Sequence, residues 1–179
     1  MAIDQGLLLW ASSLYRESEN QEYLSHGRLR PIPKVRVFVS HVTEAFRMVE
    51  GFVVLMRCSG IDAYFDWNSL YMTDEERSEG SLSVDARIAK ADVFVFLATE
   101  GSVHSKECLR QLEYAESVKR TIYIVNTKTK NTFWSINTQT RYDELSVELQ
   151  SRFSGRFKVR VREKSRNNLW VPISSSRQL

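Results

Sequence analysis

Five consecutive apolar residues, Val93-Phe94-Val95-Phe96-Leu97, form the centre of a strand-like segment at residues 91–99. A run without polar residues is typical of a strand in the middle of a parallel sheet, because helices cover both faces of such a sheet. It is much too short for a helix that crosses a membrane, which needs about 20 apolar residues. The run therefore predicts an α/β fold with a buried central strand.

Strand-like and helical patterns alternate along the rest of the chain. β-branched and aromatic runs predict strands, whereas apolar residues spaced three and four apart predict helices. Strands are predicted at residues 34–40, 61–67, 91–99 and 121–126, with an edge strand at 157–161. Helices are predicted at residues 3–24, 43–58, 82–89, 105–120 and 142–153, with a long polar loop at 68–80. This order predicts a doubly wound parallel sheet with an extra N-terminal helix.

The 179 residues suffice for one domain, and a content of 42% hydrophobic and 26% charged residues is ordinary for a globular protein. We expect an N-terminal helical extension and linker at residues 1–32, the main domain at 33–165 and a tail at 166–179. Pro31 and Pro33 close the linker, because proline opposes helix formation. The apolar stripe of the first helix, which includes Leu8 and Ala11, is expected to pack on the core or on a second copy of the chain.

Several classes of function are disfavoured by motifs that the sequence lacks. The chain has seven glycines and neither GxGxxG nor GxxxxGK[ST], which argues against a Rossmann dehydrogenase or a P-loop enzyme. It also has no GxSxG, the turn that carries the nucleophile of many hydrolases. The apolar residues 7–11 are too few for a membrane span and follow no basic segment, so we expect a cytoplasmic protein without a membrane partner.

Charge, cysteine and histidine patterns predict neither nucleic-acid nor metal binding. The net charge is +3, and the C-terminal bases alternate, as on the solvated face of a strand. Cys58 and Cys108 stand outside any ligand spacing and are predicted to be buried free thiols in a reducing compartment. The three histidines are scattered. The alternating bases are Arg156, Lys158, Arg160, Arg162 and Lys164.

Doubly wound sheets bind ligands beyond the carboxyl ends of their strands, so functional residues are expected directly after strands. Several of these residues have an equally good structural explanation: Ser40 and His41 can cap the next helix, Asp66 can hold a loop, and Trp67 can pack beneath it. The positions that follow predicted strands are Ser40 and His41, Asp66 and Trp67, residues 99–104, and Asn126 onward.

In this order and at these spacings, the segments resemble the TIR (Toll/interleukin-1 receptor) domain family. Typical members have Phe-x-Ser-His or Phe-x-Ser-Tyr at the end of the first strand, an aspartate after the second, and Ser-x-Trp-Cys-x-x-Glu-Leu at the start of a helix. The resemblance covers residues 34–126 and implies a flavodoxin-like TIR fold. Its segments are Val37-Phe38-Val39-Ser40-His41, Asp66-Trp67, a loop that closes at Gly80, Ile88-Ala89-Lys90-Ala91-Asp92-Val93-Phe94-Val95 and Ser105-Lys106-Glu107-Cys108-Leu109-Arg110-Gln111-Leu112.

In TIR proteins that consume NAD⁺, the glutamate of the last motif is the catalytic residue, and the resemblance places it at Gln111. Ser105 and Cys108 match the motif, whereas the tryptophan position holds Glu107. Glutamine keeps the shape of glutamate without its charge. The chain is then either a naturally silent domain or one in which a glutamate was replaced to preserve a substrate complex.

Another carboxylate near residue 111 is a fallback for the missing charge. Glu107 lies about one helical turn earlier, on the same stripe as Gln111, whereas Glu113 points away. The alternative explanation of Glu107 is a first-turn acid that complements the helix dipole.

The resemblance implies an NAD⁺ glycohydrolase or cyclase that makes an ADP-ribose-derived immune signal, as in bacterial antiphage defence of the Thoeris kind. NAD⁺ would be a substrate, with no further cofactor and no metal. Implied partners are further TIR copies and a separate effector that senses the nucleotide. Because Gln111 replaces the glutamate, we expect this sequence to be inactive. Two alternatives remain: a non-enzymatic TIR interaction module and an enzyme resembling nucleoside deoxyribosyltransferases.

Overall fold

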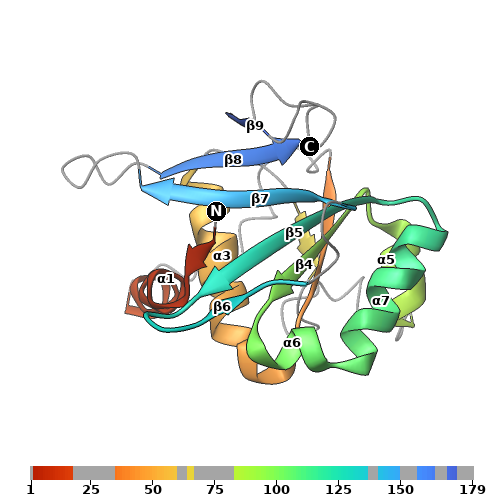
Figure 1. Ribbon diagram of the computed structural model, residues 1–179, viewed down its shortest axis with the longest axis horizontal. Helices are drawn as coiled ribbons and strands as arrows, with labels where there is room; N and C mark the ends of the chain where they lie inside the picture. The colour runs from red at the N-terminus through yellow and green to blue at the C-terminus, as the bar shows by residue number, and fades with distance from the viewer. Residues whose placement is uncertain are drawn as a thin grey trace.

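The computed structural model describes residues 2–17, 35–59, 64–66, 83–136, 141–149, 157–163 and 169–172 (Figure 1). These residues form a mostly parallel central sheet with helices on both faces, as the sequence predicted. The strands of the parallel part, in their order across the sheet, are β3 (Tyr64–Asp66), β2 (Arg36–Ser40), β4 (Val93–Ala98), β5 (Thr121–Lys128) and β7 (Asp143–Leu149).

Numbered along the chain, the five parallel strands lie in the order 2-1-3-4-5, which is the flavodoxin-like arrangement. The fold class is therefore confirmed. Two antiparallel strands, β8 (Phe157–Glu163) and β9 (Leu169–Pro172), extend the sheet beyond β7.

Helices cover the two faces of the sheet in two groups (Figure 1). On one face lie α1 (Gln5–Glu17) and α3 (Phe46–Cys58), the latter preceded by the 3-10 helix η2 (Thr43–Ala45). On the other face lie α5 (Val84–Lys90), α6 (Glu100–His104) and α7 (Lys106–Ser117).

The central strand β4 contributes to the cores on both faces, which explains its uninterrupted apolar sequence. Val93, Val95 and Leu97 belong to the core beneath α1 and α3. Phe94 and Phe96 belong to the core beneath α5 and α7. All six residues of β4 are buried, as expected for a parallel strand between two helical layers.

The N-terminal helix packs on the core, the first of the two possibilities that its apolar stripe left open. Leu8 is fully buried where α1 crosses α3. The approach is so close that a Cβ on Gly51 of α3 would lie 1.8 Å from the Leu8 carbonyl oxygen. Ser12 of α1 also donates a buried hydrogen bond to Glu50 of α3. Ahead of the helix, β1 (Ile3–Asp4) pairs in parallel with the end of β5.

The C-terminal third differs from the sequence-based prediction. The predicted helix at residues 142–153 is wrong, because residues 143–149 form the strand β7. There Leu145 and Val147 alternate in the core, which is the period of a strand. The segment at 157–161 belongs to the strand β8, as predicted, but β8 is not at the edge of the sheet, because it pairs with β7 on one side and β9 on the other. Strand β9 falls within residues 166–179, which were assigned to a tail.

Two further details complete the comparison. Helix α6, which the sequence did not predict, begins at Glu100 directly after β4, and the two-residue strand β6 (Phe133–Trp134) pairs antiparallel with β5. Cys58 is exposed at the end of α3, so the prediction of two buried thiols holds only for Cys108. The predicted linker at 26–33 and loop at 68–80 lie outside the described residues.

Candidate functional site

The order in which the chain adds strands to the sheet reverses between β2 and β4. After β2 the chain continues to α3 on one face, and after β4 it continues to α6 and α7 on the other. The carboxyl ends of two such strands border a crevice in which open α/β sheets bind their ligands. The candidate site lies at this edge.

Ser40, the last residue of β2, is buried and points toward α7. Its side chain shares a face of the sheet with Phe38, which belongs to the core beneath α5 and α7. The Ser40 Oγ donates a hydrogen bond of 2.7 Å to the Oε1 of Gln111. The two side chains are only 1% and 8% exposed, so this contact is shielded from bulk water.

Gln111 faces the sheet because of its place in α7. Ser105 starts this helix as its N-cap, with its Oγ accepting a hydrogen bond from the Cys108 backbone N–H. Cys108, Gln111, Leu112 and Ala115 then follow at spacings of three and four, and all four are buried. The Gln111 Nε2 donates to the Oε1 of Glu107 at 3.1 Å, so both ends of the amide have partners.

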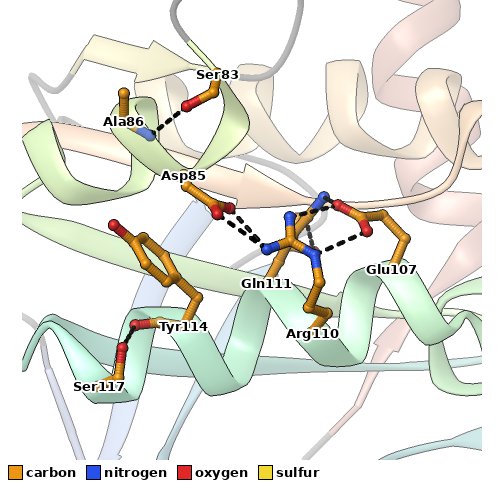
Figure 2. Close-up of polar contacts among 9 residues, drawn as sticks. Ser83, Asp85, Ala86, Glu107, Arg110, Gln111, Tyr114 and Ser117 are labelled. Carbon is orange, nitrogen blue, oxygen red and sulfur yellow. Dashed lines mark hydrogen bonds and ion pairs between the residues drawn. The ribbon is translucent and has the colours of Figure 1, made fainter.

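Glu107 belongs to a charged network that ties α7 to α5 (Figure 2). Arg110 forms a two-pronged contact with the Glu107 carboxylate, at 2.9 Å from Nε and 2.8 Å from Nη2. The Nη1 of Arg110 reaches Asp85 of α5 at 2.8 Å. Hydrogen bonds from Arg110, and then from Gln111, lower the pKa of Glu107 to about 2. A carboxylate that stays charged across the physiological range thus stands next to Gln111.

His41 follows Ser40, and its surroundings favour the neutral form of the ring by lowering its pKa. Its Nδ1 lies 3.0 Å from the Val39 carbonyl oxygen, and since a carbonyl only accepts, Nδ1 carries the proton. Burial lowers the pKa of His41, the hydrogen bond to Val39 partly offsets this, and the positive charge of Arg87 lowers it further. The Nε2 of the neutral ring is therefore left as an acceptor.

The segment after β4 completes this edge. Thr99 and Ser102 cap the start of α6 reciprocally through side chain and backbone. Gly101 approaches the loop after β2 so closely that a Cβ there would lie 2.8 Å from Val42 Cγ2. His104, the last residue of α6, contacts Trp134 of β6 edge-to-face, with ring centres 6.4 Å apart.

The structure brings some of the sequence-derived site residues together and gives others structural roles. Ser40, Gln111 and Glu107 form one hydrogen-bonded chain. By contrast, Ser105 is a helix cap and Cys108 is a core residue with 2% exposure.

The two site candidates of the second strand are less fully defined. Asp66 ends β3, where its backbone pairs with Phe38 of β2. Trp67 lies outside the described residues.

Sequence reasoning missed Arg110 and Asp85. The spacing of Glu107 and Arg110 on a helix is the signal that would have suggested their ion pair. No local signal connects Arg110 to Asp85, which is 25 positions away.

A hollow of about 320 Å³ lies elsewhere, at the amino end of β5. Its polar groups contact one another: Glu116 pairs with Arg141 and accepts a hydrogen bond from the Tyr142 hydroxyl. Burial, followed by the charge of Glu116, raises the pKa of Tyr142. This hollow is on the opposite edge of the sheet from Ser40.

Comparisons with known proteins add no family to this geometry. No protein-family model matches the chain, and no curated protein matches it either. Within the described residues, no cluster of three or more histidine, cysteine or acidic side chains could hold a metal ion. The same part of the chain contains no helix with the length and apolar character needed to cross a membrane.

Proposed function

We propose that the crevice between β2 and β4 binds NAD⁺, and that the chain is a TIR-type NAD⁺ glycohydrolase or cyclase whose glutamate position is occupied by Gln111. The observation that carries the proposal is the buried hydrogen bond between Ser40 and Gln111. It joins the end of β2 to α7, the helix of the Ser-x-x-Cys-x-x-Gln-Leu segment, at the edge where this class of sheet binds ligands.

The chemistry of the proposed reaction explains why residue 111 matters. When nicotinamide leaves, the bond between its ring nitrogen and the ribose C1′ breaks, and the electron pair goes to the nitrogen. The ribose then carries a developing positive charge, which a carboxylate stabilises and a neutral amide does not. Water or a hydroxyl of the nucleotide then forms the new bond to C1′ and loses its proton to solvent, which gives a linear or cyclised ADP-ribose product. We therefore expect this sequence to bind NAD⁺ without appreciable cleavage.

Glu107 supplies negative charge nearby but is poorly suited to replace a glutamate at residue 111. Its two oxygens accept hydrogen bonds from the guanidinium of Arg110, which offsets the charge. With a pKa of about 2, it is also a weak base at neutral pH.

The test is a swap of the two side chains. The single variant Gln111→Glu would place a second carboxylate where the amide now donates to Glu107, and like charges at that distance oppose each other. The double variant Glu107→Gln with Gln111→Glu keeps the net charge and one amide–carboxylate contact. Each variant and the parent are incubated with NAD⁺, and free nicotinamide is measured by chromatography. We expect release by the double variant at least about 100-fold above the parent, a difference of roughly 3 kcal/mol in barrier.

Glu107→Ala in the parent background is the control for the fallback carboxylate. If the parent itself cleaves NAD⁺ and this change abolishes cleavage, the acting carboxylate is Glu107 and our ranking is wrong. If none of the variants binds or cleaves NAD⁺, the proposal fails.

A second candidate function, a non-enzymatic TIR interaction module, is favoured by one observation. Both ends of the Gln111 amide are already engaged within the chain, as expected of a structural residue. This alternative predicts self-association or binding to another TIR domain that is unaffected by NAD⁺. Sedimentation of the parent with and without NAD⁺ separates the two proposals.

The wider role follows from the first proposal. An ADP-ribose-derived product would serve as an immune signal in antiphage defence, read by a separate nucleotide-sensing effector, and further TIR copies would assemble with this chain.

A further inference from the structure

We propose that Asn126 is a ligand-recognition residue that reads an amide-like edge, with a donor next to an acceptor, on a ligand bound beside Ser40. This inference rests on the proposed function, because nicotinamide and adenine, the two ends of NAD⁺, both present such an edge.

Asn126 is buried without satisfying its hydrogen-bonding capacity. It lies near the carboxyl end of β5 and is 4% exposed. Among the described residues, its Oδ1 has no hydrogen-bond partner. A buried amide oxygen without a partner is costly, so most such groups in proteins are paired with protein, water or a ligand.

The strand register places Asn126 on the same face and at the same edge as Ser40. Ile122 and Ile124 of β5 belong to the core beneath α5 and α7, so Asn126, two positions further, projects to that side. Ser40 of β2 projects to the same side, where it meets Gln111. Both residues therefore lie at the carboxyl edge of the sheet, on the face that α5 and α7 cover.

The separation of the two residues suits a ligand with more than one ring. Ser40 pairs with Phe96 of β4, and Asn126 pairs with Ala98, two positions further along. Asn126 is thus displaced from Ser40 by about 10 Å across the strands and about 7 Å along them. The side chains of Phe96 and Ala98 on β4 face the same side and stand between the two residues. A nucleotide whose sugar lies at Ser40 would reach Asn126 with a base or a carboxamide.

An asparagine amide is chemically matched to both ends of NAD⁺. Its Oδ1 accepts and its Nδ2 donates, which complements the amine and ring nitrogen of adenine in a two-pronged contact. The carboxamide of nicotinamide offers the same alternation. A phosphate offers acceptors only, so the residue favours the base-like ends of the ligand over its phosphates.

The experiment compares NAD⁺ binding by calorimetry in the parent, Asn126→Leu and Ser146→Ala. Leucine has a similar shape without the amide. Ser146 is the matched control, because its Oγ is also buried without a partner among the described residues, but it lies in β7. We expect Asn126→Leu to weaken NAD⁺ binding about tenfold, with a Tm equal to or above that of the parent, and Ser146→Ala to leave affinity unchanged. Equal affinity of Asn126→Leu and parent would overturn the proposal and assign the free oxygen to a buried water.

Two analogues decide which end of the ligand is read. Nicotinic acid adenine dinucleotide lacks the carboxamide donor, and nicotinamide hypoxanthine dinucleotide lacks the adenine amine. The parent should bind one of them about tenfold more weakly than NAD⁺, and Asn126→Leu should lose that discrimination. If the parent discriminates against neither analogue, Asn126 does not read the ligand.

A separate measurement distinguishes failure of this inference from failure of the proposed function. If the parent binds no dinucleotide, the NAD⁺ proposal falls. The side-chain ¹⁵N–¹H signals of Asn126 are then followed during titration with adenosine and, separately, nicotinamide. A shift in the Asn126 signals that is absent from those of the exposed Asn131 supports recognition of the amide-like edge, and no shift overturns it.

Discussion

At the scale of single residues, the surroundings of Gln111 are matched to an amide. Ser40 requires an acceptor and Glu107 requires a donor, and glutamine offers one of each. A glutamate at the same position would satisfy Ser40 but would turn an oxygen toward the Glu107 carboxylate. The residue that the TIR resemblance identifies as a departure is thus compatible with its neighbours as they stand.

The pKa of Glu107 provides a test of the charged network. The carboxyl pKa is lowered from 4.5 to about 2, chiefly by Arg110, so the charged form is favoured in the folded protein. The contribution to stability is therefore present above about pH 4.5 and is lost as the pH falls toward 2. We predict a midpoint near 2 for the Glu107 side chain in a ¹³C NMR titration.

Two variants complete that titration. Arg110→Gln should move the midpoint up toward 4.5, because the first cause of the shift is removed. Lys106→Gln removes an exposed positive charge from the same turn of α7 and should leave the midpoint near 2. An unchanged midpoint in Arg110→Gln would show that the two-pronged contact is absent in solution.

The candidate site was predictable from the sequence in part. The rule that ligands bind after strands led to Ser40, and the family motif led to Gln111, but only the packing of α7 on the sheet brings the two within hydrogen-bonding distance. Ser105 and Cys108 fit the motif equally well, yet Ser105 caps α7 and Cys108 is buried in the core. Serine and cysteine are common in these structural roles, so the motif alone does not separate the two explanations.

At the scale of secondary-structure elements, prediction from the sequence succeeded where the spacing of apolar residues fits one type of element. It failed where the spacing fits both a helix and a strand. The run in β4 is short and consists mostly of β-branched and aromatic residues, which favours a buried strand. In β7, Leu145 and Leu149 are four residues apart, as in a helix, but Val147 between them also fits a strand. Pairing with β5 and β8 decides the outcome, and such long-range contacts leave no local mark in the sequence.

The crossing of α1 and α3 predicts an unusual response to a helix-favouring substitution. Replacing a helical glycine by alanine normally stabilises a protein by about 0.5–1 kcal/mol. At Gly51, however, the added Cβ would lie 1.8 Å from the Leu8 carbonyl oxygen, which is backbone and must be displaced. We predict that Gly51→Ala lowers the free energy of unfolding by about 3 kcal/mol, measured in urea.

Gly6→Ala is the control for that measurement. A Cβ at residue 6 of α1 would meet only the side chain of Asp4, which can move. We expect the free energy of unfolding to change by less than about 1 kcal/mol. Equal effects of the two substitutions would mean that α1 does not pack on α3 as described.

At the scale of the whole molecule, one sheet joins segments from both ends of the chain. Strand β1 begins at Ile3 and β9 ends at Pro172, and both belong to the sheet that contains the candidate site. These segments fall in the stretches that the sequence assigned to an extension and a tail. Their role could not be inferred locally, because strands of two and four residues are too short to show a period.

The sheet order predicts which backbone amides are best protected from exchange with solvent. Strand β4 is hydrogen-bonded on both sides, to β2 and β5, and all its side chains are buried. Strand β3 is at the end of the described strand order. We predict that β4 amides exchange at least about 100-fold more slowly than those of β3 in hydrogen–deuterium exchange. Comparable rates in the two strands would contradict the order β3-β2-β4-β5.

The edge-to-face contact of His104 with Trp134 gives this protein an intrinsic optical reporter. Trp134 belongs to β6 and pairs with Thr127 near the carboxyl end of β5, and its ring contacts His104 of α6. Any nucleotide, peptide or second subunit that parts the two rings changes the polarity around the indole and hence its fluorescence. Occupancy of this region can therefore be followed without a label, and a Trp134→Phe variant identifies the share of the emission that comes from it.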